Sequence, residues 1–170
     1  GDGDYYQIPK SRNRESVLDP YIYPIQGVDV MITSLVVPVH NTDGRFIGIT
    51  GIDVTLDGLQ KMVEGISIAG LPSAYVTFYS SNGTVVASKE FETIGTRLTA
   101  TAADDGFSGL VLGGEDFAAT RTSEFLGDEV LTHGTAVEIG KTGTNWMVAV
   151  NVPTSELLAG TRQATMLFII

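Results

Sequence analysis

Two long runs of apolar and β-branched residues dominate the first third of the chain. One covers residues 28–39 and the other residues 46–54, and the second run includes an acid, Asp53, between apolar neighbours. The segment "NTDG" at residues 41–44 separates them and is a strong turn signal. This pattern predicts a long antiparallel hairpin that places a carboxylate near the end of its second strand.

Helical spacing follows the hairpin. In "LDGLQKMVEGI", the apolar residues Leu56, Leu59, Met62 and Val63 recur at intervals of three and four. This spacing predicts a short helix that packs back on the hairpin sheet. The segment "GLPS" at residues 70–73 then breaks the pattern.

A second set of strands follows Gly70. Strands are expected at residues 74–80 and 84–88, on either side of the turn "SNG", and one helical turn is expected in "TAADDG" at residues 101–106. Three further strands are expected at residues 117–123, 129–139 and 145–152, with "GKTGT" as the last hairpin turn. Because meander connections favour antiparallel sheets, the chain is expected to be an α+β protein with two sheet units that meet near Gly70.

The C-terminal segment, residues 154–170, becomes more apolar towards Ile170. It begins with a helix-start pattern, "PTSE", and ends in "MLFII". A membrane-spanning helix needs about 20 apolar residues. The segment is therefore either an ordinary amphipathic terminal helix or a helix that leads into a membrane segment. The N-terminal "GDGDYY" has no apolar run and is expected to be a polar linker at an internal point of a longer chain.

Composition excludes several classes of function. The net charge is −10, and the 10 basic residues form no stripe, which argues against nucleic-acid binding. The absence of cysteine excludes disulfides and thiolate metal sites. The two histidines, His40 and His133, have no metal-ligand spacing, and "GKTGT" lacks the rest of a phosphate loop. Without a nucleophile motif, neither an enzyme nor a cofactor is expected.

Four of the six tyrosines lie within the first 23 residues, at Tyr5, Tyr6, Tyr21 and Tyr23. Tyrosine has a flat apolar face and a polar tip, which suits a pocket for a small amphipathic ligand. A carboxylate such as Asp53 in that pocket would bind an ammonium group. In the alternative interpretation, the tyrosines pack at the rim and Asp53 caps the following helix.

From Tyr5 to Gln60, the chain resembles the double Cache family of extracellular sensors. The resemblance rests on an aromatic–Tyr pair, a "PK" step, "PY", "VP", "DGRFIGITGID" and "LDGLQ", in this order. The segments "YVTFYSSNGTVVAS" and "NWMVAVNVPTSEL" resemble the membrane-proximal half of that family. These sensors belong to methyl-accepting chemotaxis receptors and sensor histidine kinases.

The resemblance implies two stacked PAS-like antiparallel sheets, the first of which lacks its long N-terminal helix. Residues 1–70 would form the membrane-distal subdomain and residues 71–153 the membrane-proximal subdomain. Residues 154–170 would form a helix that enters the second transmembrane segment. The resemblance also implies a homodimer anchored in the cell membrane, with this domain on the periplasmic or extracellular side.

Site residues transfer by position. In members of the family that bind amino acids, "R.WY" supplies an arginine and two aromatics, and here Tyr5 and Tyr6 match the aromatics while Gly3 replaces the arginine. Tyr21 matches the tyrosine of "PY.D", where Tyr23 replaces the acid. Asp53 matches the acid of "GvD", which binds the ligand amino group.

Without the arginine, an amine, a quaternary ammonium or a neutral nitrogen heterocycle is expected as the ligand. An anionic ligand would need Lys10, Arg12, Arg14 or a group outside these residues. The resemblance therefore predicts a ligand-sensing domain of a transmembrane chemoreceptor. The alternatives are a histidine kinase input domain and a non-sensing dimerisation or adhesion domain.

Overall fold

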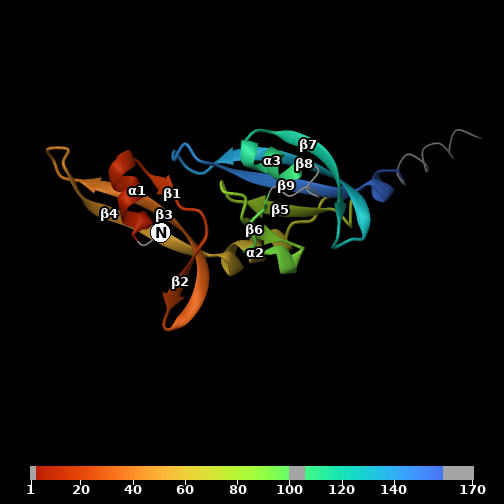
Figure 1. Ribbon diagram of the computed structural model, residues 1–170, viewed down its shortest axis with the longest axis horizontal. Coiled ribbons are helices and arrows are strands. Elements are labelled where there is room, and N and C mark those ends of the chain that lie inside the picture. The colour runs from red at the N-terminus through yellow and green to blue at the C-terminus, as the bar shows by residue number, and fades with distance from the viewer. Residues whose placement is uncertain (1–2, 100–105, 159–170) are drawn as a thin grey trace, which may run out of the picture.

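The computed structural model describes residues 3–99 and 106–158 as an elongated molecule with two antiparallel sheets. The two sheets lie one after the other along the long axis, and a short helix, α2, lies at their junction (Figure 1). The predicted α+β class with two sheet units is confirmed.

The first sheet is built around one long central strand, β3. Strands β1 and β2 pair with one edge of β3, and β4 pairs with the other edge. The four strands are β1 (Ser16–Val17), β2 (Tyr21–Ile25), β3 (Val28–His40) and β4 (Phe46–Thr55). The predicted long hairpin is therefore confirmed, and β2 extends it into a second hairpin that projects from the molecule (Figure 1).

Helix α1 (Asp4–Arg12) covers part of the first sheet and begins inside "GDGDYY", which the sequence predicted as a polar linker. An acid in its first turn and two bases in its last turn complement the helix dipole. The helix buries Pro9 and ends at Asn13, whose φ of 52° is left-handed. The sequence did not predict this helix because its apolar residues do not recur at a clear helical period.

Helix α2 (Leu56–Glu64) forms where predicted, and its Leu56 packs with Val17 of the first sheet, as expected. The side chain of Thr55 caps the helix by accepting from the Gly58 N–H at 3.2 Å. Its buried Val63 packs with Val76 and Ala87 of the second sheet. The apolar face of α2 therefore packs against both sheets, and the helix lies at their junction.

The second sheet contains the five predicted strands in the order β6-β5-β9-β8-β7. They are β5 (Tyr75–Tyr79), β6 (Val85–Ser88), β7 (Phe117–Ser123), β8 (Asp128–Glu138) and β9 (Asn145–Pro153). A 3₁₀ helix, η1 (Phe91–Thr93), follows β6, and helix α3 (Phe107–Gly113) precedes β7. The sequence did not predict α3, a seven-residue helix with glycines beside both of its ends.

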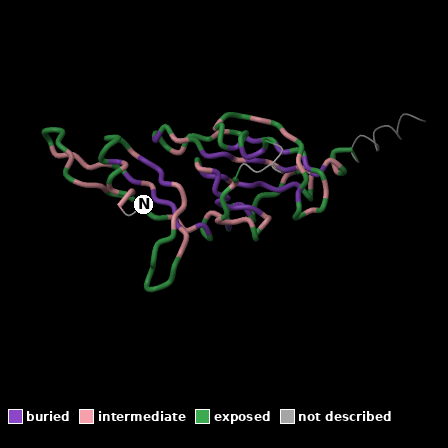
Figure 2. Tube along the Cα trace, in the orientation of Figure 1, coloured by how far each residue is buried: buried purple, intermediate pink, exposed green. Residues whose placement is uncertain are grey.

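The core lies on both faces of the second sheet, which is the more buried half of the molecule (Figure 2). On one face, Phe107 and Val111 of α3 pack against Tyr79, Val85 and Met147. On the other face, α2 covers the sheet. This two-sided burial gives the second unit a core of its own.

Trp146 joins the two units. It is 8% exposed and shares a cluster with Val17 of β1, Leu56 of α2 and Val86 of β6. Towards the C-terminus, residues 154–158 are helical. The rest of the expected C-terminal helix, residues 159–170, lies outside the described residues. Among the described helices, none has the length and hydropathy needed to cross a membrane.

Candidate ligand-binding site

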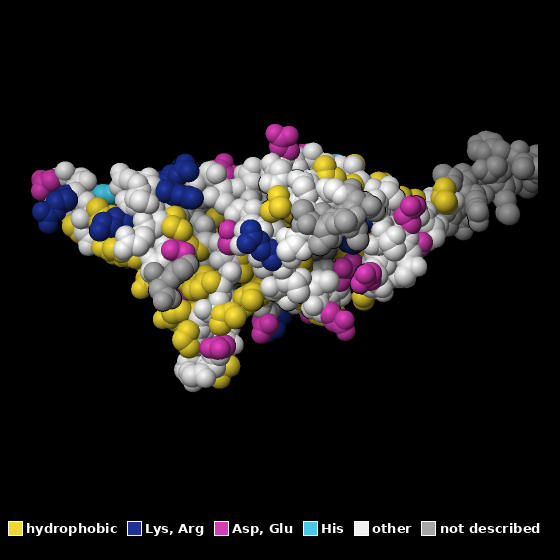
Figure 3. All heavy atoms as spheres, viewed as in Figure 1, with side chains coloured by type: hydrophobic (Ala, Val, Ile, Leu, Met, Phe, Trp, Pro, Cys, Tyr) yellow, Lys and Arg dark blue, Asp and Glu magenta, His cyan; other side chains and the backbone are white. Residues whose placement is uncertain are grey.

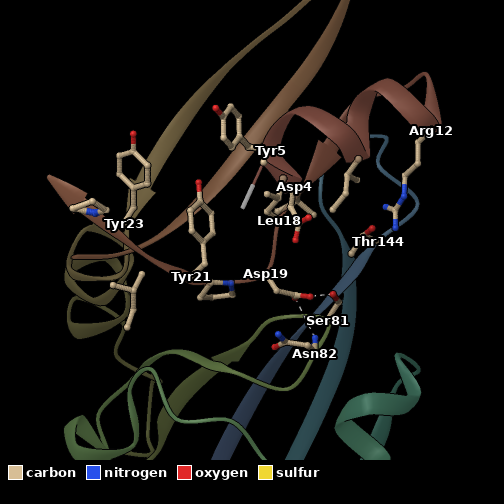
Figure 4. Close-up of a pocket in the computed structure, with 16 residues that line it drawn as sticks. Asp4, Tyr5, Arg12, Leu18, Asp19, Tyr21, Tyr23, Ser81, Asn82 and Thr144 are labelled. Atoms are coloured by element: carbon tan, nitrogen blue, oxygen red, sulfur yellow. Dashed lines mark hydrogen bonds between the residues drawn. The ribbon is translucent and has the colours of Figure 1, made fainter. Parts of the chain in front are cut away.

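A cavity of about 620 Å³ lies where α1, β2 and the loops of the second sheet meet. Helix α1 covers one side of it, and the chain from Val17 to Pro24 covers another. The second sheet contributes Ser81 and Asn82 from the β5–β6 turn and Thr144 from the β8–β9 loop (Figure 4). Both units therefore shape the same cavity.

Three of the predicted tyrosines line this cavity. Tyr5 comes from α1, and Tyr21 and Tyr23 come from alternate positions of β2, so they share one face of the strand. The rings of Tyr21 and Tyr23 meet edge to face with centroids 6.4 Å apart. Tyr5 and Tyr23 remain 47% and 46% exposed, so their surfaces are available to a ligand.

Asp19 fixes the opposite wall of the cavity. Its Oδ1 accepts from the Ser81 hydroxyl at 2.7 Å and from the Asn82 backbone N–H at 3.2 Å. Figure 4 shows these two bonds between the first unit and the β5–β6 turn, and it shows Arg12 extending from α1 towards Thr144. The cavity wall is thus a contact between the two units.

Asp53 does not line the cavity, but it connects through Ser34 to Tyr21, which does. It lies on β4 directly opposite Ser34 of β3, and its Oδ1 accepts from the Ser34 hydroxyl at 2.5 Å. The Ser34 oxygen is in turn 2.7 Å from the Tyr21 hydroxyl. Because Thr55 caps α2, the alternative in which Asp53 caps that helix is wrong.

Tyr6 and Lys10 also belong to α1, but they do not line the cavity. The Tyr6 ring packs edge to face on Phe46 at 5.7 Å, and the Lys10 ammonium lies 5.3 Å from the Tyr6 ring centre. Neither residue is therefore brought together with Tyr21.

Sequence reasoning missed three parts of this site. The turn "SSNG" was identified only as a turn, Asp19 was not considered, and Ser34 was hidden inside an apolar strand. The signal for Asp19 was its place before Pro20, because the Asp-Pro step often starts a turn. For Ser34, the signal was the adjacent pair of hydroxyl residues, Thr33 and Ser34, inside an apolar strand.

A second polar cluster lies between α3 and the second sheet. The Tyr75 hydroxyl donates to Glu90 and lies 3.1 Å from Ser123, and Arg121 forms an ion pair with Glu90 at 3.4 Å. Burial first, and then the hydrogen bond to Glu90, raises the pKa of Tyr75. Burial also raises the pKa of Tyr79 to about 12. The mutual hydrogen bonds of this cluster satisfy the Tyr75 hydroxyl and the Glu90 carboxylate, while Arg121 Nε is buried without a partner among the described residues.

The two histidines lie in different sheets. His40 is hydrogen bonded to Asn13 at 2.6 Å, and His133 is exposed on β8. Within residues 3–99 and 106–158, no three His, Cys, Asp or Glu side chains gather into a metal site.

Comparisons with known proteins agree with this architecture. The sequence profile of the Cache domain matches residues 2–161. Over 60 residues, which are 35% of the chain, the sequence is 35% identical to the methyl-accepting chemotaxis protein TlpQ of Pseudomonas aeruginosa, of which the match covers 8%.

Solved sensor domains share the fold. The extracellular domain of the histidine kinase candidate mmHK1S-Z3 is similar with a TM-score of 0.77 and 24% identity, over 95% of this chain and 57% of that one. The ligand-binding domain of the Pseudomonas aeruginosa amino acid chemoreceptor PctB, in complex with L-Arg, is similar with a TM-score of 0.64 and 15% identity. That match covers 90% of this chain and 60% of PctB. The chain therefore spans less than two thirds of each of these proteins.

Proposed function

Since the chain belongs to the Cache domain family, we propose that it is the ligand-sensing part of a transmembrane chemoreceptor. The Cache domain is a sensory, ligand-binding domain and not a catalytic one, so the chain is not an enzyme. The observation that carries the proposal is the cavity of about 620 Å³ between α1, β2 and the loops of the second sheet. A cavity of this size accommodates a small molecule.

The lining of the cavity favours a nitrogenous ligand. Three tyrosine rings offer apolar faces and hydroxyl groups, and Tyr21 connects through Ser34 to the carboxylate of Asp53. Aromatic faces next to a carboxylate suit an ammonium group or a nitrogen heterocycle. An organic acid would instead use Arg12, the basic residue at the Thr144 end of the cavity (Figure 4).

The junction of the two units supports a signalling role. A ligand in the cavity would touch the first sheet and also the β5–β6 turn, which Asp19 holds by two hydrogen bonds. Such a ligand biases the position of the second unit, because any difference in contacts between two arrangements shifts their populations.

We propose that residues 1–70 and 71–153 are the membrane-distal and membrane-proximal subdomains. In this proposal, residues 154–170 lead to the membrane, and the domain faces the periplasm or the exterior as part of a homodimer.

The test is a thermal-shift screen of the chain against amines, amino acids, organic acids and nucleobases, followed by calorimetry. A ligand at 100 times its Kd stabilises the folded state by about 2.7 kcal/mol. We expect hits among the amines or nitrogen heterocycles and loss of binding in Asp53→Ala, which remains folded because Asp53 is exposed. Undiminished affinity of Asp53→Ala would contradict the assignment of the site, and silence across the screen would contradict the sensing role.

One observation favours a second candidate function, an interaction domain that forms dimers without a ligand. Hydrophobic side chains gather over the projecting β2–β3 hairpin (Figure 3), where Ile22 is 62% and Val28 is 64% exposed. Exposed apolar patches mark interaction surfaces. This function predicts self-association in analytical ultracentrifugation that Ile22→Lys abolishes and that no small molecule alters.

A further inference from the structure

We propose that Ser34 sets the hydrogen-bond polarity of the cavity, so that Tyr21 offers an acceptor and the site selects ligands with an N–H donor. The inference rests on the proposed sensing function and deepens it, because it names the chemical group that the site recognises. It also assigns a role to Ser34, a residue that does not itself line the cavity.

The register of the first sheet brings three side chains together. Ser34 pairs with Asp53 across β3 and β4, and Tyr21 pairs with Ile32, two positions before Ser34. Since side chains alternate along a strand, Tyr21, Ser34 and Asp53 lie on one face of the sheet. The three groups form a chain of short hydrogen bonds, at 2.7 Å from Tyr21 to Ser34 and 2.5 Å from Ser34 to Asp53.

The number of protons determines the direction of both bonds. A carboxylate only accepts, so the Ser34 hydroxyl donates its single proton to Asp53. The Ser34 oxygen can then only accept in its other bond, and Tyr21 is the donor there. Ser34 is 1% exposed, so water does not compete freely for its hydroxyl group.

Tyr21 therefore has no proton left for the cavity that it lines. Its phenol oxygen presents lone pairs, and the carboxylate at the end of the chain polarises them further. An ammonium or ring N–H donates to this oxygen, while a carboxylate or ether oxygen meets another acceptor. A quaternary ammonium group is cationic but has no N–H, so this site should also disfavour it.

Three probes with the same n-butyl chain separate these contributions: n-butylammonium, n-butyltrimethylammonium and pentanoate. The first is a cation with N–H donors, the second is a cation without them, and the third is an acceptor. In calorimetry with the complete chain, we expect n-butylammonium to bind about tenfold or more tightly than either of the others. Equal binding of the two cations would show that charge and aromatic contact suffice, and it would overturn the proposal.

Two variants test the role of Ser34 itself. Ser34→Ala frees the Tyr21 proton, and Tyr21→Phe removes the acceptor, so each should weaken n-butylammonium binding about tenfold. Because both changes interrupt one chain of bonds, the double variant should lose no more than either single variant. The control is Thr50→Ala, which removes an exposed hydroxyl from the opposite face of the same sheet and should leave affinity unchanged.

The results distinguish failure of this inference from failure of the proposed function. If Asp53 contacted the ligand directly, Asp53→Asn would weaken binding while Ser34→Ala would not, which overturns the role of Ser34 alone. If only organic acids bind in the broader screen, the sensing role stands and the donor-selective site is wrong. If nothing binds at all, both are wrong. Melting temperatures of each variant confirm that the changes in affinity occur in folded protein.

Discussion

Alkaline pH should destabilise this protein through two tyrosines of the second sheet. Tyr79 is 3% exposed beneath Phe107, and burial raises its pKa from 10.0 to about 12. Tyr75, two residues earlier on the same face, also has a raised pKa, caused first by burial and then by its bond to Glu90. In the folded state both hydroxyls therefore stay protonated at a pH where they ionise in the unfolded chain.

The magnitude follows from proton linkage. Above about pH 10, the unfolded chain has lost a proton from each tyrosine that the folded chain retains, so stability falls by about 1.4 kcal/mol per pH unit per tyrosine. The stabilising contribution is complete below the unfolded pKa and is lost as the pH rises towards the folded pKa of about 12. At about pH 11, Tyr79 alone accounts for a loss of about 1.4 kcal/mol.

Urea unfolding, followed by the fluorescence of Trp146, the only tryptophan, measures this loss. Between about pH 9 and about pH 11, wild type should lose about 1.4 kcal/mol more stability than Tyr79→Phe, which cannot ionise. Val85→Ala, a change in the same cluster, serves as control and should lower stability equally at both pH values. An identical pH dependence of wild type and Tyr79→Phe would refute the reasoning.

Three further changes test the contacts that shape the molecule. Asp19→Ala removes the bonds to Ser81 and the β5–β6 turn and should lower the free energy of unfolding by about 1–2 kcal/mol, measured by urea titration. Arg121→Met leaves the largely buried Glu90 without its cation and should cost about 3 kcal/mol, and Arg121→Met combined with Glu90→Gln should cost less in the same assay. Gly51→Ala would place a Cβ 2.5 Å from a backbone oxygen of β3, so a fall of several degrees in melting temperature is expected, compared with Thr50→Ala as control.

Short-range patterns in the sequence predicted most of the strands. Both hairpin strands around residues 41–44, the five strands of the second sheet and the position of α2 followed from local periodicity and turn residues. These features depend on neighbours within a few positions, so the sequence alone carries them. Helix α1 escaped because it does not repeat its apolar residues at a clear helical period, and α3 escaped because it is only seven residues long and rich in glycine.

Contacts between segments that are distant in the sequence could not be predicted from local patterns. The sequence suggested that Tyr5, Tyr21 and Asp53 share a pocket, but it did not show that α1 and the β5–β6 turn close the cavity. It placed α2 on the first sheet and did not show that the helix also covers the second sheet. Its helical spacing specifies an apolar face, while the position of the second sheet decides what that face covers.

The link between Tyr21 and Asp53 depends on one irregularity in the register. Near the turn, His40 pairs with Phe46, and continuing this register along the hairpin would place Ile52 opposite Ser34. A bulge between Val39 and His40 shifts the pairing by one residue and places Asp53 there instead. The residues of each strand can be read from the sequence. A shift of one residue moves every side chain of a strand to the other face of the sheet, so the register decides which carboxylate meets which hydroxyl. That register was set only when the sheet formed.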